Sequence, residues 1–262
     1  MNSTTSKKSL KILYNVIGII LLFVIIQILS FIKNDNTVFP NVIDIFRNFF
    51  DLLKNGKTYL FILHSVLELV IAVIASAIVG ITFGVIGAIN EPFRHIIKPF
   101  MVFIRSIPMI IIAILLITLV DSIAIPSVAA GLVIMPLFYE STKEGILNID
   151  SNLLDVYKFY SNTNAKVVLK IHLPLIMGYT KQAFANAIGL GFKVIITSEY
   201  IAGVAKTLGY NIYSAYFAVL DFAGIYAYGL LLIIIVLIIE GLPNLALFVI
   251  DKIRKSFRKQ LK

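Results

Sequence analysis

Long apolar stretches alternate with short polar segments along this chain, and the pattern predicts helices that cross a membrane. A bilayer core of about 30 Å requires about 20 mostly apolar residues per helix. Six stretches approach or exceed that length: Ile12–Ile32, Val66–Ile89, Pro99–Val120, Ile123–Tyr139, Leu173–Ala202 and Ile225–Ile250. We therefore expect an all-α membrane protein with about six transmembrane helices. Residues 12–250 would form a single membrane domain, with a basic amino terminus at 1–11 and a basic tail at 251–262.

Two shorter patterns refine this picture. Between the first two predicted spans, Val42, Phe46, Phe49 and Leu53 recur at helical spacing and charged residues fill other positions, which predicts an amphipathic interfacial helix. In the second span, small residues recur every fourth position: Ala72, Ser76, Gly80, Gly84 and Ala88. Such a row lets another helix approach closely, either within the same bundle or across a subunit interface.

Composition supports the membrane interpretation and excludes several kinds of site. Apolar residues make up 59% of the 262 residues and charged residues 14%, and the mean hydropathy is +0.95. Cysteine is absent, which excludes disulfides and thiolate metal sites. The three histidines, His64, His95 and His172, lie far apart, so we expect no metal site. The chain has no phosphate-binding G-x-x-x-x-G-K-[ST] loop, so any ATP and Mg²⁺ would be bound by a partner.

The distribution of charge predicts the orientation. Of the 23 Lys and Arg residues, fifteen fall in segments on the side of the amino terminus and five on the other side. The positive-inside rule then places both termini in the cytoplasm. The basic tail, within a net charge of +9, would face lipid headgroups rather than nucleic acid.

The connection at about 141–172, between the fourth and fifth predicted spans, is long for a compact helical bundle. Apolar residues such as Val156, Tyr157 and Tyr160 precede a turn that begins at Ser161, and a second apolar group follows the turn. This pattern predicts a cytoplasmic helix–turn–helix. It would either dock a partner or lie on the membrane.

The same loop resembles the cytoplasmic signature of ABC importer permeases, an E-A-A, a glycine and then I-x-L-P at fixed spacing. The matching positions are Asp155, Val156 and Tyr157 for E-A-A, Ser161 for the glycine, and Ile171, Leu173 and Pro174 for I-x-L-P. The spacing is kept, whereas Val-Tyr replaces Ala-Ala and Ser replaces Gly. The resemblance implies that this loop couples the permease to a cytoplasmic ATPase.

The resemblance extends over nearly the whole chain and is closest to the sulfonate/nitrate/taurine branch of these permeases. The matching segments are His64–Leu67, Arg105–Pro108, Gly189–Gly191 with Glu199, and Leu208–Tyr210. Glu68 stands where that branch commonly has a basic residue, and the segment Leu115–Asp121 replaces an aromatic-glycine stretch.

The family implies a type I importer with two permease copies, an ATPase dimer and an external substrate-binding protein. Its solute would be a sulfonate, a nitrate-like anion or a vitamin precursor. The chain itself would be a transport subunit rather than an enzyme. An ion-gradient-driven secondary transporter is the alternative, although we find no internal repeat or coupling-ion site. A membrane enzyme is less favoured, because no His/Asp/Glu cluster ends a span.

Polar residues within an apolar helix mark candidate pathway positions. In the fifth predicted span, Gln182, Asn186 and Lys193 share one helical face. Lys193 would either attract an anion or pair with an acidic group such as Glu199 or Glu240. Pro108, inside the third predicted span, predicts a kink and is a candidate gating position. Aromatic residues of the segment Gly203–Gly224 would form either a platform for the binding protein or a belt at the headgroups.

Overall fold

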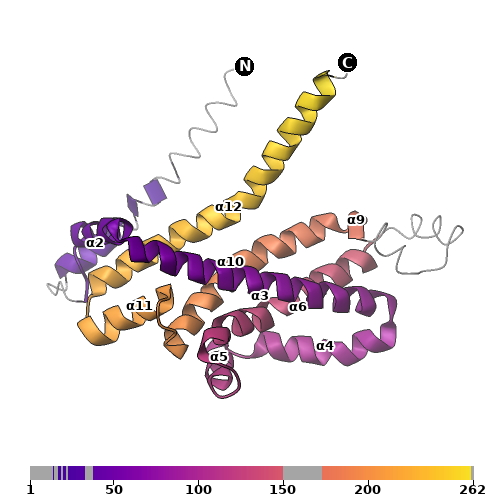
Figure 1. The fold of residues 1–262 in the computed structure, drawn as a ribbon, viewed down its shortest axis with the longest axis horizontal. Coiled ribbons are helices and arrows are strands. Elements are labelled where there is room, and N and C mark those ends of the chain that lie inside the picture. Colours follow the sequence, from indigo (N-terminus) through magenta and orange to yellow (C-terminus); the bar gives the residue numbers. More distant parts are fainter. Residues whose placement is uncertain are drawn as a thin grey trace, which may run out of the picture. The chain divides into compact units, whose positions relative to one another are not determined.

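The computed structural model describes residues 14, 17, 18, 20, 21, 23–32, 38–149 and 173–260, with only the backbone of 242–260. These residues form helices joined by short turns, and no strand occurs among them (Figure 1). The elements in chain order are α2 (Val42–Lys54), α3 (Gly56–Ile89), α4 (Glu91–Ser106), α5 (Met109–Ile117), η1 (Ser122–Ala124), α6 (Ile125–Leu147), α9 (Leu173–Leu175), α10 (Met177–Ala202), α11 (Leu208–Ser214), η3 (Ala215–Val219) and α12 (Phe222–Gln260). The predicted all-α fold is confirmed.

The chain divides into two compact units. The first comprises Met1–Tyr59 and Asn211–Ile233, and the second comprises Leu60–Tyr210 and Ile234–Lys262. In the first unit, the predicted amphipathic helix is present as α2. The Asn41 side chain caps it by accepting a hydrogen bond from the Ile43 amide. Its apolar face is packed, since Ile45 is buried and Phe46 contacts Phe23 with ring centroids 5.2 Å apart.

In the second unit, the small-residue row of α3 packs against α6. A Cβ atom added to Gly80 would lie 2.6 Å from Phe138 Cβ, and one added to Gly84 would lie 2.7 Å from Thr142 Cβ. Ser76 Oγ donates a hydrogen bond of 2.8 Å to the Gly131 carbonyl. The row therefore lets two helix backbones meet within one chain, which is the first of the two predicted interpretations.

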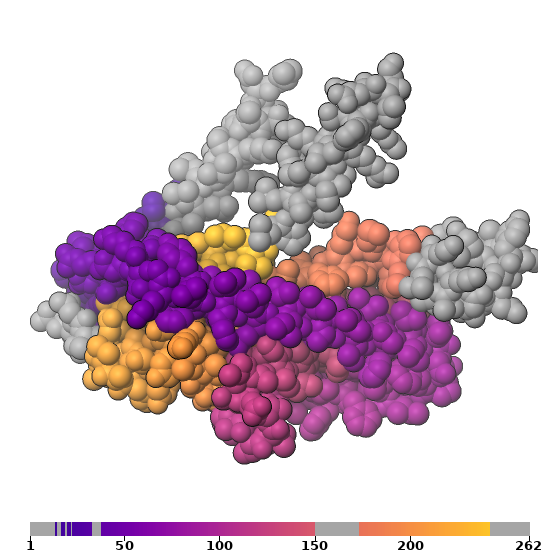
Figure 2. Space-filling model, viewed as in Figure 1, coloured from indigo at the N-terminus to yellow at the C-terminus, as the bar shows by residue number. Residues whose placement is uncertain are grey.

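The predicted span Pro99–Val120 is not one continuous helix. Instead, α4 begins at Glu91 and ends at Ser106, and α5 leaves it at an angle of 94° (Figure 1). Pro108 has no amide hydrogen, and it restricts Ile107 to an extended conformation with ψ of 127°. The predicted kink at Pro108 is thus a sharp elbow, and α5 projects below α3 in the space-filling view (Figure 2).

Other predicted boundaries also shift. The span predicted to begin at Val66 is part of α3, which begins earlier, at Gly56. The span predicted to end at Tyr139 is part of α6, which continues to Leu147 and so includes the first residues of the predicted loop. Within the described part of the chain, three helices are long and apolar enough to span a membrane, or four if α4 and α5 count as one broken span. The number of six spans stays a prediction.

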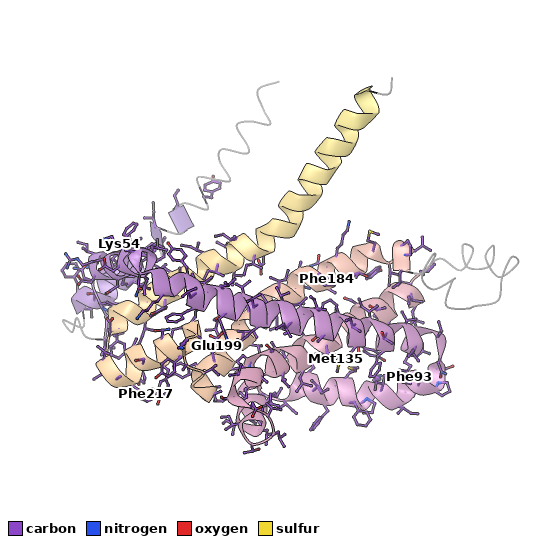
Figure 3. The ribbon with its side chains drawn as sticks, viewed as in Figure 1. Lys54, Phe93, Met135, Phe184, Glu199 and Phe217 are labelled. Carbon is purple, nitrogen blue, oxygen red and sulfur yellow. The ribbon has the colours of Figure 1, made fainter. Side chains whose placement is uncertain are left out.

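The core of the second unit lies where α6 packs extensively against α10. Phe138 of α6 is fully buried, and its ring meets that of Phe184 of α10 edge to face, with centroids 4.9 Å apart. Figure 3 labels Phe184 and also Met135 of α6. This contact holds one side of α10 against α6.

Candidate functional site

One side of α10 carries the polar residues that the sequence suggests for a pathway. Within α10, Ala183, Ala187 and Phe192 are buried, whereas Gln182, Asn186, Leu190 and Lys193 are exposed. We call these four exposed residues the α10 strip. Gln182 Nε2 donates a hydrogen bond of 3.1 Å to Asn186 Oδ1, so two of its members are joined. The predicted shared face of Gln182, Asn186 and Lys193 is present.

Lys193 has neither of its two suggested acidic partners within the described chain. Glu199 is engaged elsewhere, and the Glu240 carboxylate occupies the space that a side chain at Gly189 would fill. Among the described residues, no ion pair includes Lys193. Its ammonium group is therefore available to a ligand or to another molecule.

A hollow of about 310 Å³ adjoins the α10 strip. The elbow between α4 and α5, the α6 helix and Leu190 of the strip line it. Arg105 and Glu140 are its charged residues. Glu140 is paired with Lys143 of its own helix, whereas Arg105 has no ion pair among the described residues. The hollow thus brings a cation and a carboxylate beside the strip, and the R-x-I-P motif predicted this arginine without indicating where it lies.

A buried carboxylate joins three of the segments that carry the family resemblance. Glu199, near the end of α10, is fully buried. Its Oε1 accepts a hydrogen bond of 2.6 Å from Ser65 Oγ of α3, and its Oε2 accepts one of 2.8 Å from the Gly209 amide. Figure 3 labels Glu199 where α10 passes α3. Glu199 therefore fastens α3 and the segment after α10 to the end of α10.

Most of the predicted ATPase-coupling residues lie outside the described residues: Asp155, Val156, Tyr157, Tyr160, Ser161 and Ile171. The last two positions of the motif are described. Leu173 and Pro174 form the short helix α9, which is separated from α10 only by Ile176. The end of the motif is thus directly connected to the helix that carries the strip.

Comparison with curated proteins finds two cyanobacterial relatives. Both are bicarbonate transport system permease proteins CmpB, one from Synechococcus elongatus and one from Synechococcus sp.. Each is 24% identical over 142 residues, which cover 54% of this chain and 51% of the relative. The matched region therefore spans about half the length of these relatives.

Among solved structures, a chain of the MetNI methionine ABC transporter in an inward-facing conformation has the same fold. The TM-score is 0.59 at 18% identity, and the match covers 75% of this chain and 94% of that one. The sequence profile of binding-protein-dependent transport system inner membrane components matches residues 80–250, which include α6, the predicted coupling motif and α10. This chain belongs to that family, the permeases of ABC importers.

Proposed function

We propose that this chain is the membrane permease subunit of an ATP-driven importer for a small anion, and that the anion passes along the α10 strip. The observation that carries the proposal is the exposed polar strip itself, bordered by the hollow that contains Arg105. Polar and charged side chains at membrane depth are costly and are usually retained for a pathway.

The charges of this region favour an anionic solute. Lys193 and Arg105 form no ion pair among the described residues, and Leu190 connects the strip to the hollow. A planar guanidinium group suits carboxylate-like and oxyanion ligands, and an ammonium group adds a point charge. The two relatives are described as bicarbonate transport permeases. Bicarbonate is an oxyanion, as are nitrate and the sulfonate group. An uncharged vitamin precursor would leave both cations uncompensated.

A second copy of the chain would complete the pathway. The side chains of the α10 strip are exposed in the single chain, so a solute on the strip would gain its further wall from another molecule. A symmetric dimer presents the same surface from both partners and would enclose the route between two strips. We therefore propose a homodimer in the membrane, with both termini on the cytoplasmic side.

Energy would come from a cytoplasmic ATPase dimer that binds ATP and Mg²⁺. The segment between the end of α6 and residue 172 would dock into it through Asp155 and Tyr157. Because Pro174 lies in α9, directly before α10, a movement of the docked loop would be transmitted to the strip. The Pro108 elbow would let α5 move separately from α4 as the pathway opens on alternate sides.

An external binding protein would deliver the solute. Aromatic side chains cluster after α11 in the first unit, where Tyr216 contacts both Phe217 and Phe222 at centroid distances of 4.8 and 5.9 Å. Tyr216 is 39% exposed and Phe217 is 60% exposed. Exposed aromatic clusters of this kind suit a protein interface.

Replacement of Lys193 by methionine tests the proposal. In proteoliposomes that contain the permease and its co-purifying ATPase, we expect Lys193→Met to reduce uptake of radiolabelled bicarbonate, nitrate or taurine at least about tenfold, because one charge-assisted contact is lost. Lys181→Met is the matched control, because Lys181 is exposed on the same helix but outside the strip. Equal uptake by the wild type and Lys193→Met, with the ATPase still bound, would contradict the proposal.

A further inference from the structure

A second group of ionisable side chains lies apart from the α10 strip and has no role in the proposed transport. His64 and Glu68 are one turn apart on α3, and Glu199 reaches them from α10. One ligand atom from each of the three lies within 4.8 Å of the others. His64 Nδ1 is 3.5 Å from Glu68 Oε1. We call these three residues the His-Glu-Glu cluster.

Glu68 is the unsatisfied member of the cluster. It is only 5% exposed, and neither of its carboxylate oxygens accepts a hydrogen bond from a donor group among the described residues, although its carboxyl group is close enough to that of Glu199 to share a proton with it. Nδ1 of His64 also lacks a hydrogen-bond partner there. Buried polar atoms are nearly always hydrogen-bonded, so this group of atoms requires either a bound cation or a shared proton.

The charge of the cluster points to a cation. In the described chain, no Lys or Arg forms an ion pair with Glu68 or Glu199. A protonated His64 would compensate one carboxylate and leave the other. An uncompensated charge in a buried site is strongly unfavourable. A divalent cation would compensate both carboxylates and leave His64 neutral, which is the form that binds metals.

The donor set and its spacing fit a transition metal. One imidazole nitrogen and two carboxylate oxygens suit Zn²⁺ and similar ions, whereas Mg²⁺ and Ca²⁺ prefer oxygen donors alone. Ligand atoms of a tetrahedral zinc site lie about 3.4 Å apart. The separation of 3.5 Å between His64 Nδ1 and Glu68 Oε1 already matches this value.

The surroundings of Glu199 support the same function. Ser65 Oγ and the Gly209 amide each hold one oxygen of this carboxylate, at 2.6 and 2.8 Å. Such outer contacts orient a metal ligand. The His64 side chain is 42% exposed, so the cluster reaches the surface of the chain.

We propose that His64, Glu68 and Glu199 bind one divalent transition-metal ion, which joins α3 to the end of α10. The site would be structural and resident, and it does not depend on which solute the permease carries. The competing arrangement is a proton shared between the two carboxylates, which would require no metal.

Zinc binding to the purified full-length chain tests this proposal. The protein would carry no polyhistidine tag, be stripped with EDTA in detergent, and be titrated with Zn²⁺ by calorimetry and with Co²⁺ by visible absorption. We expect about one ion per chain and a more than about 100-fold loss of affinity in Glu68→Gln, since this removes a ligand rather than an outer contact.

A matched control exists on α4. His95 and Glu91 are also one turn apart, with 3.7 Å between His95 Nε2 and Glu91 Oε1, but both are exposed and form no part of such a cluster among the described residues. Glu91→Gln should therefore leave zinc affinity unchanged. If the wild type binds zinc no more tightly than Glu68→Gln, the proposal is overturned in favour of the shared proton.

A second measurement needs no variant. Saturating Zn²⁺ should raise the midpoint of thermal unfolding of the wild-type chain, because a ligand that binds only the folded state stabilises it. EDTA should reverse the rise. An unchanged midpoint with Zn²⁺ would also overturn the proposal. Uptake is not measured in either experiment, so failure here leaves the proposed transport function standing.

Discussion

Ser65 Oγ donates a hydrogen bond of 2.6 Å to Glu199 Oε1, although 134 positions separate the two residues in the sequence. The bond joins α3 to the end of α10 in a region where both side chains are fully buried. A hydrogen bond to a carboxylate in such surroundings is stronger than one at the surface. This contact is therefore a principal tie within the second unit.

Removal of that hydroxyl should destabilise the fold. Ser65→Ala leaves Glu199 Oε1 without its donor, and we expect the free energy of unfolding to fall by about 1.5–3 kcal/mol. Ser106→Ala is the control, because Ser106 Oγ donates its hydrogen bond to the Val102 carbonyl of its own helix at an exposed position. Thermal unfolding in detergent measures both. Equal midpoints for the two variants would show that the Ser65–Glu199 bond adds nothing.

The close contact between α3 and α6 gives a second prediction. In Gly84→Ala, the new methyl group would lie 2.7 Å from Thr142 Cβ and 2.8 Å from the Tyr139 carbonyl, so the helices must separate. Overpacking of this kind costs about 1–3 kcal/mol. Gly229→Ala on α12 has no atom within 4 Å of the added Cβ and should be tolerated. Equal stability of both variants, measured by thermal unfolding, would contradict the packing described here.

Features with a local cause were predictable from the sequence. The amphipathic helix α2 and the small-residue row of α3 follow from spacing along a helix, and both are confirmed by their contacts. The break at Pro108 follows from the chemistry of proline. The angle of 94° could not be predicted in this way. Proline chemistry breaks the helix, whereas tertiary packing sets the direction of α5 after the break.

The His-Glu-Glu cluster shows what the sequence could not provide. The spacing of the histidines predicted no metal site, since His64, His95 and His172 are far apart in the sequence. His64 and Glu68 are one turn apart, but Glu199 joins them only through the packing of α10 on the same unit. The acidic residue at 68, where the resembling permeases commonly have a basic one, was the signal available beforehand.

The elbow between α4 and α5 should depend on Pro108. Pro108→Ala removes the restriction on Ile107 and supplies an amide hydrogen, so α4 and α5 should straighten toward one helix. Spin labels at Ile96 and Ile114, both exposed, report the change, and the chain has no native cysteine to interfere. A continuous helix would place these positions about 27 Å apart, farther than the bent form.

Pro99→Ala serves as the control for that experiment, because Pro99 lies within α4 and away from the bend. Its label distance should match that of the wild type. If Pro108→Ala also keeps the wild-type distance, the packing of α5 rather than the proline maintains the elbow.

The proposed ATPase contact gives a further prediction. Tyr157→Ala removes an aromatic anchor worth about 2 kcal/mol or more at a binding hot spot, and Asp155→Arg reverses a charge beside it. Both variants should lose substrate-stimulated ATP hydrolysis in the reconstituted complex and recover less ATPase in a pull-down. Lys181→Met, outside the loop, should behave as wild type. Normal stimulation and recovery in both loop variants would show that another segment couples the subunits.

Chemical accessibility of the α10 strip tests the central claim most directly. Single cysteines at Asn186 and Lys193 should react with a membrane-impermeant maleimide in proteoliposomes, because a transport pathway admits water. Cysteines at Ala187, which is buried, and at Ile78, which is exposed on the apolar surface of α3, should not react. Labelling of the strip positions alone is the result we predict. If the strip cysteines stay as unreactive as the one at Ile78, the strip faces lipid and the proposed pathway is wrong.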